Sequence, residues 1–518
     1  MKQPRLTYLF LVLLLALLSA SCKKDSLPAP VAEEEESGSG VYVSVVVNTQ
    51  EESGSRADGA TDDYNPTGGE NGDGNQAGEG EENMVHDLNV FFFQGEVDEN
   101  TGERLGINST DNPSIVCRLY FDQLLQTSAS SNGIDAVWQS PVQEVTDILQ
   151  IGQTYDVLVI ANAGDLRTQN LNTLNTLRDY QVANPITNNN TYFLMASEND
   201  ADVEIQASTK NNPITVSVDV ERMTARVDCA WEEEYTVEHK APNAGGNQGD
   251  DKVKILGAAL VNRYRNNTYA FKRVTDGTDL DNYTIDYLGL EKTTADGIAS
   301  NYVLDPKTID GKNNNDYTYY YTEYVDWDVY NDFRDPTNGN VTSNGDRTYY
   351  LLDYTRENIN TESRLSEEEG VERYATGIMF KAQYKPAGFT EGETFYRYTA
   401  SDGGAPKLYT AEALIDAFPE TFDDNNQSSW GDIEGCDVFL NGWCYYIYWI
   451  RHADDGDVSK ISPMEYAIVR NNIYQLYVNS VGQLGTPDPD SNVEEVDTEI
   501  HIQVKGWASI DVEVPAFD

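Results

Sequence analysis

Apolar and polar positions alternate near the start of the chain. Every second residue of 41–47 is a valine, and Tyr42, Ser44 and Val46 lie between them. A period of two in β-branched residues predicts a half-buried strand. The link that follows, residues 50–59, is polar and rich in Gly and Ser, so we expect it to be exposed to proteases. It contains Arg56, where an arginine-specific protease could cut, and we interpret the strand as a removable placeholder. Its apolar positions are Val41, Val43, Val45 and Val47.

Short apolar runs separated by turn residues continue along the chain and indicate many further strands. Residues 213–227 alternate over most of their length and predict the longest of them. Asp165 is expected to cap a short leucine-containing helix, and Asn441-Gly442 is expected to turn a hairpin. One short helix without βαβ alternation predicts an all-β fold of antiparallel sandwiches. The other predicted strands are 84–94, 115–120, 155–162, 254–259, 348–352, 377–384, 445–450 and 468–478.

The C-terminus has the pattern of a β-ribbon on a tether. Residues 482–496 form a linker with two prolines, and two strands follow, hinged at Gly506-Trp507. Each strand has one apolar face and one polar face. Such a ribbon is able to fold back onto its own domain or to reach another molecule, and the pattern leaves both open. The apolar positions are Ile500, Ile502, Val504, Ile510, Val512 and Val514.

The first 22 residues are a targeting segment rather than part of the fold. Lys2 and Arg5 precede an apolar run, 6–18, that is too short for a comfortable membrane span. The sequence Leu-Ser-Ala-Ser-Cys that ends at Cys22 resembles a bacterial lipobox. We therefore expect acylation of Cys22 and attachment of the precursor to a membrane. The alternative is an ordinary signal peptide with an incidental cysteine.

Charge and residue chemistry exclude several classes of function. Acidic residues outnumber basic ones by 87 to 35, and a field that negative repels nucleic acid, which is not expected as a partner. The segment 57–83 is acidic, rich in Gly and without Lys or Arg, which is typical of disorder. Because no CxxC or Cys/His cluster occurs, the cysteines are expected to be buried small hydrophobes rather than zinc ligands.

Motifs of catalysis are missing from the sequence. There is no nucleophile elbow, HExxH, P-loop or dinucleotide fingerprint, and the four histidines are scattered. Two oxygen-rich loops, 276–281 and 454–457, do not have EF-hand spacing and are expected to be solvated. We expect no enzymatic activity, no cofactor and no metal, although a pair of catalytic carboxylates would be invisible without geometry.

Several motifs, taken in order, resemble those of a known family. The lipobox at Cys22 and the Ser-Arg-Ala-Asp-Gly of 55–59 come first, and Trp507 lies in the terminal strands. Together they resemble the fimbrillins, pilin subunits of type V fimbriae in Bacteroidetes-type bacteria, with the closest likeness to the major subunit of the short fimbriae. Residues 240–440 match that pattern poorly. The other matching stretches are 219–227, 444–450, 469–474 and 500–514.

The resemblance implies a fold and an assembly route. Such subunits have two transthyretin-like β-sandwich domains and are exported as lipoproteins anchored to the outer membrane. An arginine-specific protease removes the anchor and first strand, here between Arg56 and Ala57, and the C-terminal strands of the next subunit, here 500–514, fill the groove. The product is a head-to-tail fimbrium at the cell surface. The implied segments are a signal peptide (1–21), a lipidated propeptide (22–56), two sandwich domains (57–215 and 216–484), and a linker with donor strands (485–518).

Two alternatives remain open at this stage. The chain could be a fimbrial tip or anchor subunit, but it has both a cleavable-looking Arg56 and a donor-like tail, which favours the shaft. It could also be a monomeric surface lipoprotein that binds glycans through Tyr, Trp and acidic side chains. A monomeric binder has no need for a tethered tail with one apolar face. A ligand on a host or bacterial surface is compatible with each of these functions.

Overall fold

The structure is a computed structural model, and it describes most of the two sandwich regions. The predicted signal segment, Cys22, Arg56, Ala57, the two oxygen-rich loops and residues 509–518, with Ile510, Val512 and Val514, lie outside the described residues. The described ranges are 40–49, 75–78, 80–127, 137–183, 185, 192–197, 200–246, 249–263, 267–271, 273–274, 292–293, 299–300, 302–303, 333, 335, 341–344, 347–358, 366, 370–401, 403–452, 461, 465–489 and 500–508.

The N-terminal part is a ten-stranded sheet that curls into two layers. Its order is β4-β3-β8-β10-β12-β1-β6-β5, with β11 beside β8 and β7 beside β1. Strand β12 joins the layers, since residues 214–219 pair with β1 and residues 220–222 pair with β10. The bounds are β1 (Tyr42–Asn48), β3 (Leu88–Phe93), β4 (Cys117–Phe121), β5 (Leu125–Thr127), β6 (Val137–Gln139), β7 (Gln143–Glu144), β8 (Thr154–Ala161), β10 (Met195–Ser197), β11 (Ala201–Glu204) and β12 (Ile214–Arg222).

The C-terminal part is a second sandwich. A six-stranded sheet, β2-β29-β28-β13-β22-β21, packs against a four-stranded sheet, β14-β15-β23-β27. Apolar side chains from β13 and β28 share one core with those of β15, β23 and β27. The bounds are β2 (Asn75–Ala77), β13 (Ala225–Ala230), β14 (Tyr235–Thr236), β15 (Lys252–Val261), β21 (Val341–Asn344), β22 (Arg347–Thr355), β23 (Gly377–Lys385), β27 (Trp443–Trp449), β28 (Asn472–Val478) and β29 (Ile500–Ala508).

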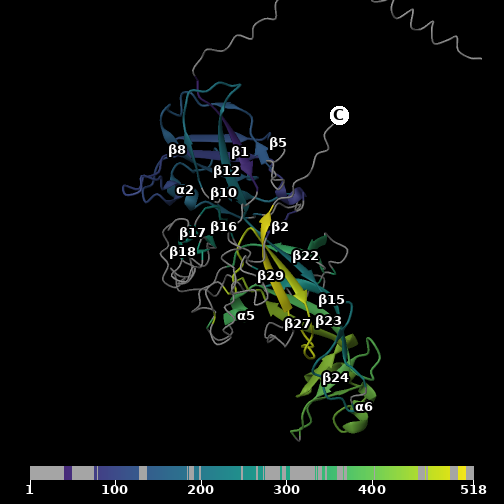
Figure 1. The fold of residues 1–518 in the computed structure, drawn as a ribbon. Coiled ribbons are helices and arrows are strands. Elements are labelled where there is room, and N and C mark those ends of the chain that lie inside the picture. Colours follow the sequence, from purple (N-terminus) through teal and green to yellow (C-terminus); the bar gives the residue numbers. More distant parts are fainter. Residues whose placement is uncertain are drawn as a thin grey trace, which may run out of the picture.

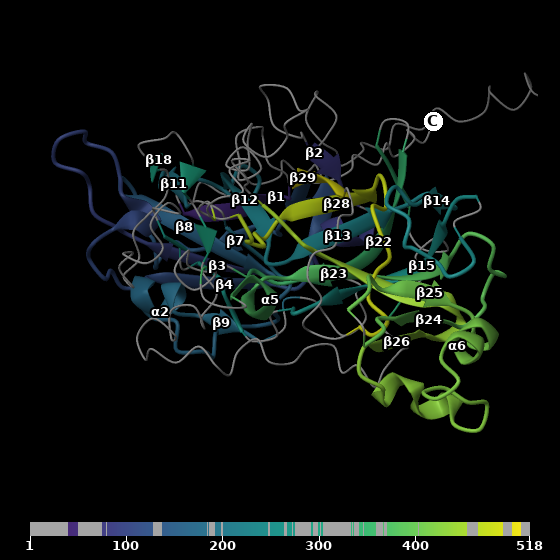
Figure 2. The ribbon, with the colours of Figure 1, turned by 90° about the horizontal axis from the view of Figure 1, so that it is seen from below.

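A small third sheet extends from the second sandwich at the end opposite the first sheet (Figure 1). Strands β24 (Phe395–Tyr398), β25 (Lys407–Tyr409) and β26 (Cys436–Phe439) pack with α6 (Ala411–Ala417) and η5 (Gln427–Asp432) around Trp430, and Figure 2 shows the same group from below. The remaining elements are η2 (Gly80–Asn83), η3 (Gly106–Asn108), α2 (Leu174–Arg178), α5 (Gly370–Tyr374), η6 (Leu440–Gly442) and the pairs β9 (Gln181–Val182) with β16 (Thr268–Tyr269), β17 (Arg273–Val274) with β20 (Tyr302–Val303), and β18 (Lys292–Thr293) with β19 (Ala299–Ser300).

The all-β prediction is confirmed. Most pairs are antiparallel, but β1 runs parallel to β12, β13 to β28, and β2 to β29. The described cysteines are buried and unpaired, and burial raises the pKa of Cys117 and Cys444 to about 12, so their thiols stay protonated. Within the described part of the chain, no helix has the length and apolarity needed to cross a bilayer.

Several local predictions are wrong, each because tertiary pairing overrides the local pattern. The run 213–227 is not one long strand, because β12 ends at Arg222 in the first sheet and β13 begins at Ala225 in another sheet. Thr173, not Asp165, caps the helix, which begins at Leu174.

The turn at Asn441-Gly442 has the positive φ values of a hairpin turn, 57° and 72°. The strands on either side nevertheless enter different sheets, because β26 pairs with β24 and β27 pairs with β23. The acidic segment 57–83 is also not disordered throughout. It contains β2 and η2, and Glu82 and Asn83 are buried.

Candidate functional site

Strand β1 lies inside the first sheet, with a neighbour on each side. It runs parallel to β12, from Val43 opposite Ile214 to Asn48 opposite Asp219. On its other side it runs antiparallel to β6 and β7. We call the space that β1 occupies between these neighbours the β1 slot. In the structure β1 is therefore a central strand of the sheet. The alternating pattern of 41–47 predicts a strand but does not tell whether it is central or at the edge.

The valines of β1 contribute to the core of the first sandwich. Val41, Val43, Val45 and Val47 are all 0–1% exposed. They share one cluster with apolar side chains of the opposite layer, including Val90 of β3. At roughly 1.5–3 kcal/mol for each buried valine, the four side chains give roughly 6–12 kcal/mol of gross burial energy.

A break in the partner strand lies opposite the middle of β1. Between β6 and β7 the chain passes through Ser140 and Pro141, and Pro141 has no N–H to donate. Ser140 closes the gap, since its N–H donates to the Val45 carbonyl (2.9 Å) and its Oγ accepts from the Val45 N–H (2.9 Å). Ser44 completes the arrangement, with its Oγ donating to the Ser140 carbonyl (3.0 Å) and accepting from Gln139 Nε2 (3.1 Å).

Two further hydroxyls hold the beginning of β1. Thr146 Oγ1 accepts from the Val41 N–H at 3.0 Å, and Ser208 Oγ accepts from the Tyr42 N–H at 2.7 Å and donates to the Tyr42 carbonyl. Backbone pairing and side-chain hydroxyls together provide hydrogen-bond partners for the backbone N–H and C=O groups of β1. Sequence reasoning predicted the strand but missed these three hydroxyl partners, which lie about a hundred or more residues away.

The first part of the predicted donor region lies in the second sandwich. Strand β29, which includes Ile500, Ile502 and Val504, pairs antiparallel with β28 from Val478–Ile500 to Asn472–Gly506. Its other edge pairs with β2 at Gly506, Trp507 and Ala508. The hinge predicted at Gly506-Trp507 is wrong, because β29 continues through it to Ala508.

The segment before β3 enters a buried polar network between the sandwiches. Glu82 lies 3.1 Å from the Arg226 guanidinium, and Arg226 also pairs with Asp228 at 2.7 Å. Asn83 accepts from Arg222 on β12, and its carbonyl accepts from the Trp138 indole at 3.0 Å. Buried charges of this kind are tolerated only when they are paired, so these contacts hold residues 82–83 at the junction.

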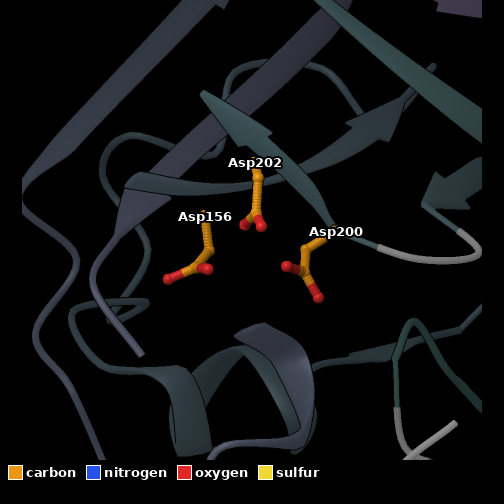
Figure 3. A group of neighbouring side chains, drawn as sticks. All are labelled: Asp156, Asp200 and Asp202. Atoms are coloured by element: carbon orange, nitrogen blue, oxygen red, sulfur yellow. The ribbon is translucent and has the colours of Figure 1, made fainter. Parts of the chain in front are cut away.

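Three carboxylates of the first sheet point toward one another (Figure 3): Asp156, Asp200 and Asp202. Arg104 lies against them, with its Nη2 2.5 Å from Asp156 Oδ2 and its Nε 3.7 Å from Asp202 Oδ1. Burial, followed by the hydrogen bond to Asp156, raises the pKa of Asp202 to about 6. The guanidinium supplies the positive charge that a cation would bring, so the geometry does not call for a metal.

Comparison with known proteins places the C-terminus in a family. Residues 437–516 match the model described as "Major fimbrial subunit protein type IV, Fimbrillin, C-terminal". None of the curated proteins matches the chain.

Three solved structures are similar over most of their length. A fimbrilin from Porphyromonas gingivalis W83 is 13% identical, covering 92% of this chain and 99% of that chain, with a TM-score of 0.37. A putative cell adhesion protein from Parabacteroides distasonis is 13% identical, covering 91% and 98%, with a TM-score of 0.36. A C-terminally truncated tip fimbrial protein from Porphyromonas gingivalis is 12% identical, covering 90% and 100%, with a TM-score of 0.33.

The family match over the C-terminal residues confirms the resemblance to the fimbrillins.

Proposed function

We propose that this chain is a structural subunit of a type V fimbria that polymerises by protease-triggered donor-strand exchange and contributes to surface adhesion. The precursor is acylated at Cys22 and anchored in the outer membrane. An arginine-specific protease then cuts between Arg56 and Ala57, and β1 leaves. The C-terminal strands of another copy fill the β1 slot, and repetition of this step makes the fimbrium.

The observation that carries the proposal is the position of β1. A buried central strand is covalently joined to the body through a polar link that contains Arg56. Loss of such a strand leaves a hydrophobic groove and two rows of unpaired backbone groups, a state that strongly favours strand addition.

The donor we propose is residues 500–514. Six aliphatic side chains at roughly 1.5–3 kcal/mol each give roughly 9–18 kcal/mol of gross burial energy. Association and ordering of the chain offset a large share of this energy. Donation from head to tail is a heterologous contact that does not close on itself, so it builds filaments rather than rings.

The decisive experiment is N-terminal sequencing and intact mass measurement of the protein sheared from the cell surface. We expect a start at Ala57, in high-molecular-weight material that resists dissociation. A start at an acylated Cys22, in a monomer, would contradict the proposal. That result would favour an anchor subunit or a monomeric glycan-binding lipoprotein instead.

A further inference from the structure

We infer that residues 507–514 of a second copy fill the β1 slot in one register, parallel to β12, with Ser509 in the place of Ser44. This inference rests on the proposed function and sharpens it, because it names the segment, direction and register of the donor. It narrows the donor from residues 500–514 to 507–514, so that Ile510, Val512 and Val514 enter the slot while Ile500, Ile502 and Val504 stay paired with β28. The argument starts from what the slot requires of any strand that occupies it.

The strictest requirement is at position 44. Ser44 is 0% exposed although it lies between two valines that face the core, and its hydroxyl both donates to the Ser140 carbonyl and accepts from Gln139. Because Ser44 is fully buried, a larger side chain would force the surrounding residues to move. A carboxylate would face the Ser140 carbonyl oxygen, and an aliphatic group would leave that carbonyl without its donor.

The tail contains one residue that meets this requirement. Ser509 is the only Ser or Thr in residues 500–518. Aligned on it, the sequence Trp507-Ala508-Ser509-Ile510-Asp511-Val512 repeats the order of Tyr42-Val43-Ser44-Val45-Val46-Val47: an aromatic residue, an aliphatic residue, serine, a branched aliphatic residue, a residue on the outer face, and valine. Val514 then takes the place of Thr49, which is buried at the end of the row.

The neighbouring registers fail at the same position. If the donor is moved by two residues along the slot, the residue at position 44 is Asp511 in one direction and Trp507 in the other. The strand 500–504 would place His501 or Gln503 there. Antiparallel insertion through Ser509 would set Gly506 in the place of Val47 and leave part of the core unfilled.

The position of β29 agrees with a donor that begins at Trp507. The ladder between β28 and β29 ends at the pair Asn472–Gly506. Residues from Trp507 onward can therefore leave without breaking it, at the cost of two of the three pairs with β2. One substitution is unfavourable, since Glu513 replaces Asn48, whose amide donates to Asp219. That contact is exposed, where repulsion between like charges is weak.

The register can be tested by disulfide cross-linking between copies. In the inferred register, residue 513 lies opposite Val137, because position 48 pairs with Val137. We expect the double variant Glu513→Cys/Val137→Cys to form a reducible covalent ladder under mild oxidation. The matched variant Glu513→Cys/Gln139→Cys should not. A register with Asp511 at position 44 would reverse this pattern, whereas a register with Trp507 there, or antiparallel insertion, would link neither pair.

A second test does not depend on cysteine geometry. Ser509→Gln should reduce the rate of polymer formation by mature subunits at least tenfold, and Asp511→Gln should leave it within twofold. Polymer from both variants at equal rates would overturn the register. Absence of polymer from the wild-type mature chain would overturn the proposed function and this inference with it, whereas wild-type polymer without the 137–513 link would overturn the inference alone.

Discussion

Two strands at the ends of the chain, β1 and β29, are held in opposite ways. Strand β1 has β12 on one side and β6 with β7 on the other. Strand β29 has β28 along one side, but β2 covers only three residues of its other side. Removing β1 opens the interior of a sheet, whereas removing β29 leaves β28 still paired with β13. Loss of β1 is therefore costly, whereas release of the chain from Trp507 onward breaks only two pairs with β2, as expected if β1 is replaced and the end of the chain is donated.

The largest expected effect comes from keeping β1 in place. Arg56→Ala should leave a folded, lipid-anchored monomer and abolish polymer, because the slot is never vacated. Size-exclusion chromatography of surface extracts measures this directly. Polymer from the Arg56→Ala variant would show that β1 need not be released. Arg56→Lys is the control for charge: it keeps the positive charge but should also abolish polymer, because an arginine-specific protease does not cut after lysine.

The next effect compares deletion of each strand. Deleting residues 40–49 should destabilise the first sandwich by several kcal/mol, since four buried valines represent roughly 6–12 kcal/mol of gross burial energy. Hydrogen exchange should then accelerate in β6 and in residues 214–219 of β12. Deleting residues 498–518 should leave both sandwiches folded and give a subunit that accepts a strand but cannot donate one. Long filaments built from that second deletion alone would refute the donor assignment.

The segment between the two strands gives a smaller effect. Glu82→Gln leaves the Arg226 charge only partly compensated and should lower the free energy of unfolding by about 3 kcal/mol. Thermal unfolding of the mature chain measures this loss. A triple variant that also carries Arg226→Met and Asp228→Asn should recover much of it, because Asp228 pairs with Arg226 as well and the whole buried charge cluster is then removed. Equal losses in the single and triple variants would show that the cluster does not act in this way.

The smallest effect tests a single hydroxyl of the β1 slot. Ser140→Ala removes the acceptor for the Val45 N–H and should cost the precursor about 1 kcal/mol in the free energy of unfolding. Ser217→Ala, at an exposed position beside β1, is the control and should change it by less than about 0.5 kcal/mol. If neither substitution changed the free energy of unfolding of the precursor, Ser140 would not be needed to hold β1.

The sequence predicts where strands lie better than it predicts which strands pair with one another. Alternation placed β1 over 41–47, one residue from its observed bounds of 42–48, because period-two patterning follows directly from burial of one face. The alternation changes phase at Glu221-Arg222, where two polar residues follow one another: the apolar positions are even-numbered up to Val220 and odd-numbered from Met223. This change of phase marks the point where the chain passes from one sheet to the other, although it does not tell which strands pair on either side.

The candidate site was predictable only in part. Composition alone assigns Glu82 and Asn83 to a disordered segment, since no apolar residue lies near them before Met84 except Ala77. They are ordered by contacts with Arg222, Arg226 and Trp138, residues that lie far away in the sequence. The hydroxyls of the slot escape prediction for the same reason, because a serine that bridges a gap in a sheet has no local signature.

Strand β12 has a mechanical consequence for any fibre built through the slot. Its first half forms one wall of the slot, its second half pairs with β10, and two residues separate it from β13 of the second sandwich. A strand seated parallel to β12 and pulled along its own length loads all its ladder bonds at once, in shear, instead of opening them one after another. Tension would pass from the seated strand into β12 and on through a short covalent path to the next sandwich. The fibre would then resist stretching far better than peeling.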